Sequence, residues 1–105
     1  MSDLQKVFDD MHERFNAEAA FGVHAVLQFE ISEGEVWVVT VQDEQCTVSE
    51  GQTEDPTVTL KLDTETLKEV LSGETDGMQA FMAGRIQAEG DIILATRLAE
   101  IFPIA

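Results

Sequence analysis

The sequence predicts an α+β domain in which helices cover one main sheet. An amphipathic helix pattern opens the chain, and four segments that alternate apolar and polar residues follow it. Two helix patterns, one strand pattern and a last helix pattern then follow up to the C-terminus. The predicted order is α-ββββ-αα-β-α, in a single domain over residues 1–105. That length allows an apolar core without disulfides or metals.

The first predicted helix spans residues 3–20 and is amphipathic. Its apolar residues recur at the three- and four-residue spacing that places side chains on one helix face. They are Leu4, Val7, Phe8, Met11 and Phe15. Gly22 is expected to lie just beyond the end of this helix.

Four strands are predicted next, over residues 23–31, 36–41, 46–49 and 57–62. The second one, VWVVTV, is apolar on both faces. It is therefore either a central strand covered on both sides or a strand that faces a cavity as well as the core. Short polar turns join the strands, which favours an antiparallel meander.

The helix predicted over residues 64–72 has clear signals at both ends. Asp63 has the side chain of a good N-cap, and Gly73 can adopt the left-handed conformation that ends a helix. Leu67, Val70 and Leu71 share one face of it and are expected to be buried in the core.

The stretch from residue 76 to 102 has similar boundaries. Asp76 is expected to start a helix that Gly84 ends, and residues 85–89 alternate as a strand does. After a turn at Gly90, Asp91 is placed to cap a last helix that stops at Pro103.

The charge is strongly negative, with 21 acidic and 6 basic residues and a net charge of −15. Such a surface repels nucleic-acid phosphates and anionic lipid headgroups, so neither nucleic-acid binding nor electrostatic docking on a membrane is expected. Stable membrane insertion is not expected either, because no apolar run approaches the ~18 residues needed to span a bilayer. The acidity fits a solvated surface, a basic partner or carboxylate clusters that bind metal. The solvated surface is the interpretation we favour, and metal binding is the one we favour least. Charge alone does not determine a function.

The chain is expected to reside in the cytoplasm. Its start, MSDLQKVFDD, lacks the basic residues and apolar block of a signal peptide. Cys46 is the single cysteine, which excludes an internal disulfide and fits a reducing compartment.

Catalysis is not expected, and neither a metal site nor a cofactor site is predicted. His12 lies in HERF, which lacks the second histidine of a zinc-binding HExxH motif, and His24 falls on the polar face of a strand. Cys46 has no basic neighbour in the sequence to favour a thiolate. Phosphate-binding and dinucleotide-binding glycine motifs are also absent from the sequence.

The C-terminal stretch carries more apolar residues than one helix face needs. Met78, Phe81 and Met82 lie within five residues, and the last helix is apolar over a wide arc. The simpler interpretation is a core helix packed on both sides, which the pattern alone favours. The other is a helix that faces the sheet on one side and a ligand cavity or partner on the other.

Two blocks of sequence resemble a known family. The first is AFMAGRIQAEGD at 80–91, followed by the ATRL run at 95–98. The second is DPTVTL at 55–60, followed by Asp63 and then Leu71-x-Gly73. In order and spacing these blocks resemble the sterol carrier protein 2 domain family.

The resemblance implies a mostly antiparallel sheet of about five strands, covered by helices and enclosing an apolar tunnel. Members of that family bind fatty acids, acyl-CoA, phospholipids or sterols without catalysing a reaction. A lipid or fatty-acyl ligand is therefore expected here. The alternative is an interaction module that forms a homodimer or docks on an enzyme partner through its apolar C-terminal face.

The expected ligand-binding residues come from the sheet and the C-terminal stretch. They are Phe29, Trp37, Met78, Phe81, Met82, Ile86, Ile93, Leu94, Leu98, Ile101 and Phe102. Arg85 and Arg97 are scarce cations that could meet a lipid headgroup. The competing interpretation of these two arginines is surface ion pairs with nearby carboxylates, which is the one we favour from the sequence.

Overall fold

The computed structural model describes residues 3–32 and 34–102, without the side chains of residues 3, 95, 96, 98 and 99. The elements in chain order are α1 (Asp3–Glu13), β1 (Ala25–Ile31), β2 (Val36–Gln42), β3 (Gln45–Glu50), β4 (Val58–Leu62), α2 (Thr64–Ser72), α3 (Gly77–Met82), β5 (Gln87–Gly90), α4 (Ile92–Thr96) and α5 (Leu98–Ile101). Within these described ranges, no helix is both long and apolar enough to cross a membrane.

The strands form one five-stranded mixed sheet in the order β3-β2-β1-β4-β5. Three of its four pairings are antiparallel, as expected, but β1 and β4 run parallel. The prediction of a four-strand antiparallel meander was therefore wrong for β4. The chain leaves β3 and crosses to the far side of β1, where Val26 and Thr57 hold it. The amide of Thr57 donates to the Val26 carbonyl at 2.8 Å, and the Val26 amide donates to the Thr57 hydroxyl at 2.9 Å.

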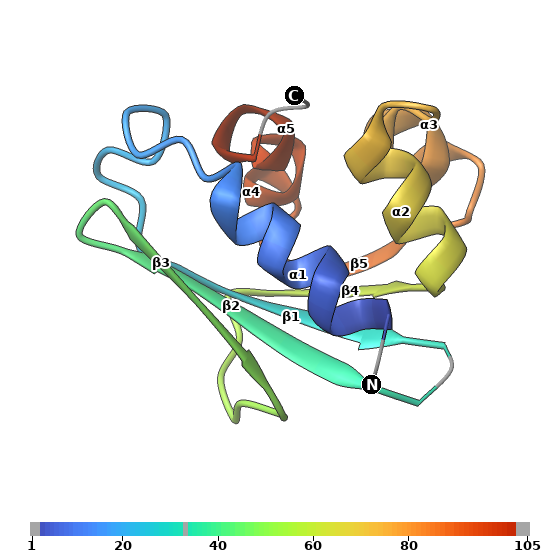
Figure 1. The fold of residues 1–105 in the computed structure, drawn as a ribbon, viewed down its shortest axis with the longest axis horizontal. Coiled ribbons are helices and arrows are strands. Elements are labelled where there is room, and N and C mark those ends of the chain that lie inside the picture. Colours follow the sequence, from blue (N-terminus) through green and yellow to red (C-terminus); the bar gives the residue numbers. More distant parts are fainter. Residues whose placement is uncertain (1–2, 33, 103–105) are drawn as a thin grey trace.

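All the helices lie on one face of the sheet (Figure 1). At the centre of that face, the Phe8 ring from α1 stacks on Trp37 with ring centroids 4.9 Å apart. It also meets Phe29 edge-on at 5.4 Å. Since Phe29 and Trp37 are partners across β1 and β2, this aromatic cluster fixes α1 over the middle of the sheet.

The opposite face of the sheet is covered in part by the loop from β3 to β4. The Thr53 amide in this loop donates to the Gln28 side chain on β1 at 3.0 Å. Gln28 and Val38 on that face are each only 7% exposed. The apolar strand β2 is therefore covered on both sides, which is one of the two interpretations its sequence allows.

The ends of α2 lie where the sequence places them. Asp63 accepts a hydrogen bond from the Thr66 amide at 2.7 Å, and Gly73 has a φ of 86°. For α3, Asp76 accepts from the Met78 amide at 2.8 Å, and Gly84 follows with a φ of 81°. These local signals act through backbone groups a few residues away, so they can be recognised from sequence.

The first helix ends at Glu13, seven residues before the predicted end at residue 20. The Asn16 side chain accepts from the amides of Glu18 and Ala19, and so starts a new turn. The Asn16 amide donates to the carbonyl of Ile101 at 2.7 Å, which ties this turn to the C-terminal helices. A tertiary contact thus competes with continuation of the helix.

Strand β5 begins at Gln87 rather than at residue 85, because the amides of Arg85 and Ile86 close the end of α3 on the Ala80 carbonyl. The single last helix predicted from the sequence is divided into α4 and α5. A tight turn at the division has the Arg97 amide donating to the Leu94 carbonyl at 2.9 Å. The predicted stop at Pro103 lies outside the described residues.

Candidate functional site

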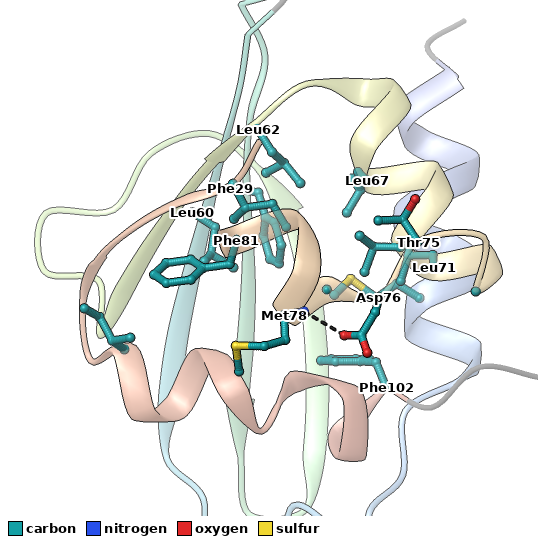
Figure 2. Close-up of a pocket in the computed structure, with 16 residues that line it drawn as sticks. Phe29, Leu60, Leu62, Leu67, Leu71, Thr75, Asp76, Met78, Phe81 and Phe102 are labelled. Carbon is teal, nitrogen blue, oxygen red and sulfur yellow. Dashed lines mark hydrogen bonds between the residues drawn. The ribbon is translucent and has the colours of Figure 1, made fainter. Parts of the chain in front are cut away.

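An apolar pocket of about 420 Å³ lies between the sheet and the helices on the β4 side (Figure 2). That volume is within the range of pockets that bind small molecules, roughly 300–1,000 Å³. Its walls come from α1, β1, β4, α2, the segment 73–76, α3, the connection from α3 to β5, α4 and the residue after α5. The lining residues are Met11, Phe29, Leu60, Leu62, Leu67, Val70, Leu71, Gly73, Thr75, Asp76, Gly77, Met78, Phe81, Ile86, Ile92 and Phe102.

The pocket exists because α3 does not bury its large apolar side chains against the sheet. Ala80 is the buried residue of this helix, at 1% exposure. Met78 and Phe81 lie at the pocket and remain 46% and 37% exposed. Two large side chains thus border an open space instead of filling a core.

The opposite wall is formed by buried side chains of β4 and α2. Leu60 and Leu62 project from β4, and Leu67 from α2; each is 5% exposed or less. Figure 2 shows these side chains together with Phe29 around the same space. Buried side chains of β4 and α2 therefore face the half-exposed side chains of α3 across the pocket.

Thr75 and Asp76 are the polar side chains among the described lining residues. The Thr75 hydroxyl donates to the Glu69 carboxylate at 2.8 Å. Asp76 accepts from the Met78 amide and so caps α3 (Figure 2). Both polar groups lie at the end of the pocket where α2 passes into α3.

Five of the residues expected to bind ligand come together in the lining. They are Phe29, Met78, Phe81, Ile86 and Phe102. They come from β1, α3, the segment before β5 and the end of the described chain. The pocket thus combines residues of the sheet and of the C-terminal stretch, as expected.

The other expected residues lie elsewhere. Trp37 is 3% exposed and stacks on Phe8 in the core. Leu94 and Ile101 are also buried in the core cluster. Met82 and Ile93 are 78% and 77% exposed and do not line the pocket, and the side chain of Leu98 lies outside the described residues.

Sequence reasoning missed the contribution of α2 and β4. Leu67, Val70 and Leu71 were expected to be buried core residues; Leu67 and Leu71 are buried in the core cluster, and all three also line the pocket. A helix face that packs on a sheet and one that borders a cavity have the same apolar spacing, so periodicity could not separate them. Ile92 belongs to the apolar surplus noted in the sequence and lines the pocket as well.

Arg85 forms an ion pair with Glu69, as the favoured interpretation from the sequence predicts. Its guanidinium donates to both carboxylate oxygens, each at 3.2 Å. The hydrogen bonds from Arg85 hold the pKa of Glu69 below its usual value, and the bond from Thr75 acts in the same direction. Arg97 is exposed and does not line the pocket.

The histidines and the cysteine lie away from the pocket lining. The His12 ring, through Nε2, is 2.9 Å from the Cys46 carbonyl, which joins α1 to β3. Burial raises the pKa of the Cys46 thiol to about 11, so its reactive thiolate form is disfavoured. Over residues 3–32 and 34–102, no group of three or more His, Cys, Asp and Glu side chains is placed to hold a metal ion.

The sequence matches the model of the SCP-2 sterol transfer family over residues 5–103. It is also similar to hydroxysteroid dehydrogenase-like protein 2 of Rattus norvegicus, with 27% identity over 101 residues. That match covers 93% of this chain but 19% of the rat protein. The chain therefore spans about a fifth of the length of the curated relatives that it matches.

Solved structures give the same fold. Sterol carrier protein 2 like 2 from Aedes aegypti matches with a TM-score of 0.77 and 24% identity, over 93% of this chain and 94% of that one. A solution structure of palmitated SCP2L2 from the same species has 28% identity and a TM-score of 0.70, over 98% and 96% of the two chains. A double mutant of the sec-alkyl sulfatase PisA1 reaches a TM-score of 0.86 at 19% identity, over 97% of this chain and 16% of the sulfatase. The chain belongs to the SCP-2 sterol transfer family.

Proposed function

We propose that this protein reversibly binds one long-chain lipid in the pocket and carries it without changing it chemically. The observation that carries the proposal is the lining, in which the described side chains are apolar except for Thr75 and Asp76. Burial contributes ~0.8 kcal/mol per methylene, so a chain of ~12 methylenes supplies about 10 kcal/mol. After the costs of ordering and association, that is enough for micromolar affinity.

Membership of the family supports this proposal, because the family is one of sterol transfer. The Aedes aegypti relative with 28% identity is described as palmitated, which places a fatty-acyl chain on a protein of this fold. Fatty acids, acyl-CoA, phospholipids and sterol-like lipids are the ligand classes we propose to compare.

The polar side chains of the lining favour binding over catalysis. Thr75 is engaged by Glu69, and Asp76 caps α3. Both therefore hold the pocket's own backbone and helices in place. Burial of a hydrocarbon requires shape and apolar surface rather than a reactive group.

A second candidate is an interaction module, which two exposed side chains favour. Met82 and Ile93 are 78% and 77% exposed, although both are apolar. The similar sulfatase and dehydrogenase-like proteins carry this fold as less than a fifth of their length. A stable oligomer in light scattering that binds no lipid would support the module and contradict the carrier.

The carrier is tested by displacement of the neutral fluorescent probe N-phenylnaphthylamine from delipidated protein. The competitors are tetradecanol, tetradecanoate, tetradecanoyl glycerol, tetradecanoyl-CoA, dimyristoyl phosphatidylcholine and cholesterol, and native mass spectrometry gives the stoichiometry. We expect one lipid per chain and displacement by at least one competitor below about 100 µM. If none of these lipids displaces the probe or adds to the mass of the protein, the carrier function is wrong.

A further inference from the structure

The polar end of the pocket carries a negative charge. Asp76 is the charged residue among the described lining residues, and its side chain is exposed. Its Oδ1 atom accepts from the Met78 amide at 2.8 Å. Figure 2 shows the carboxylate beside Met78 and Phe102, at the border of the apolar space.

No cation lines this end of the pocket in the part of the chain that the structure describes. Arg85, a headgroup candidate from the sequence, is held by both oxygens of Glu69. The Thr75 hydroxyl donates its hydrogen bond to the same Glu69 carboxylate. A lipid carboxylate or phosphate that reached this end would therefore meet an acceptor and no partner of opposite charge.

A lipid hydroxyl would meet a suitable partner in the same place. The Met78 amide occupies Oδ1 of Asp76, and within the described chain no hydrogen bond is made to Oδ2. A carboxylate oxygen accepts strongly from a hydroxyl donor, since charge assistance shortens and strengthens that bond. The same oxygen repels an anion at the same distance.

We propose, on the basis of the proposed carrier function, that Asp76 makes the pocket selective for lipids with an uncharged hydroxyl end. The favoured class is that of long-chain alcohols and monoacylglycerols, and the disfavoured class is that of lipids whose head is a carboxylate or phosphate. Two unit charges about 4 Å apart in water give roughly a fivefold effect on affinity. Salt reduces this effect, because the side chain is exposed.

The test compares matched variants with two ligands of equal chain length. Asp76→Asn removes the charge and keeps the N-cap, because asparagine caps helices about as well as aspartate. Asp55→Asn removes one charge from the loop between β3 and β4, which projects away from the helices (Figure 1). Displacement of N-phenylnaphthylamine by tetradecanol and by tetradecanoate is measured at neutral pH, at low and at high salt.

We expect Asp76→Asn to strengthen tetradecanoate binding about fivefold at low salt. Tetradecanol binding should weaken by about twofold or more, because the neutral amide oxygen accepts a weaker hydrogen bond than the carboxylate. The gain should shrink at high salt, and Asp55→Asn should change neither ligand.

Each other result overturns the inference. Equal changes for both ligands would mean that Asp76 acts through packing. An equal effect of Asp55→Asn would assign the selectivity to net charge, and no effect of Asp76→Asn would mean that Asp76 does not meet the polar end of the lipid. If neither ligand binds to the wild-type protein, it is the carrier function that fails.

Discussion

Arg85 donates two hydrogen bonds to the Glu69 carboxylate, from Nη1 to Oε1 and from Nη2 to Oε2, both at 3.2 Å. The same carboxylate accepts from the Thr75 hydroxyl, and the Thr75 amide donates to the Glu69 carbonyl. Three segments are joined in this way: α2, the connection to α3, and the connection from α3 to β5. Through Thr75, which lines the pocket, the pair holds the polar end of the pocket in place.

Replacement of Arg85 tests whether it positions the pocket's border or binds headgroups. We expect Arg85→Gln to change the affinities for tetradecanoate and tetradecanol by the same small factor, about twofold or less, because exposed ion pairs contribute little. Arg97→Gln, at an exposed arginine away from the pocket, is the matched control. A tenfold loss confined to tetradecanoate would instead assign Arg85 to the headgroup.

Gly90 is a glycine at which a side chain has no room. Its φ is 101°, and a Cβ there would lie 2.5 Å from the Thr57 carbonyl oxygen. We expect Gly90→Ala to lower the free energy of unfolding by about 3 kcal/mol or more, measured by urea denaturation.

Gly84→Ala is the control for this change, since Gly84 has a φ of 81° and nothing within 4 Å of a Cβ. Its expected cost is about 1 kcal/mol, from backbone conformation alone. Equal losses of stability in the two variants would show that the close approach of Gly90 to Thr57 does not exclude a side chain at position 90.

Filling the pocket should abolish lipid binding without unfolding the protein. Val70 on α2 is half-buried and lines the pocket, so Val70→Trp places a large ring in the space that the lipid would occupy. We expect at least a tenfold loss of affinity for tetradecanol, measured by displacement of N-phenylnaphthylamine. Glu65→Trp puts the same residue on an exposed position of the same helix and should bind normally. Normal binding by Val70→Trp would place the lipid elsewhere.

Cys46 should be unreactive in the folded protein. Burial raises its pKa to about 11, whereas a free thiol has a pKa of about 8.5. At pH 8 the folded thiol should react with a disulfide reagent about a hundredfold more slowly than the thiol of urea-unfolded protein.

The same shift predicts how stability depends on pH. The folded state binds the thiol proton more tightly, so this contribution is complete below the unfolded pKa of about 8.5. It is lost as the pH rises through about 11, and Cys46→Val should remove that loss. Equal reaction rates in folded and unfolded protein would contradict the raised pKa.

The helix α2 shows what the sequence determines locally. Its residues 64–72 were predicted without error, because Asp63 and Gly73 act on backbone groups within a few residues of themselves. The parallel pairing of β1 with β4 could not be predicted in the same way. It depends on contacts such as that of Val26 with Thr57, which are 31 residues apart in the sequence. The lengths of the turns do not indicate which distant strand will pair with β1.

The pocket was predictable only in part, for a similar reason. Phe81 and Met78 were predicted as ligand-binding residues, because α3 has more apolar surface than its length can bury. Leu67 and Leu71 were not, because a regular apolar face is explained equally well by packing against a sheet. Whether such a face meets a neighbour or a void depends on where α3 stops, and that is a property of the tertiary structure.

The central claim is that the space between β4, α2 and α3 holds a hydrocarbon chain. Methyl NMR with tetradecanol on delipidated, carbon-13-labelled protein tests it most directly. We expect nuclear Overhauser contacts from the chain to Leu67, Val70 and Ile86, and unchanged shifts at Val39 and Val41, which are fully buried outside the pocket. Contacts confined to the exposed side chains of Met82 and Ile93, with no change at Leu67 or Val70, would contradict the claim.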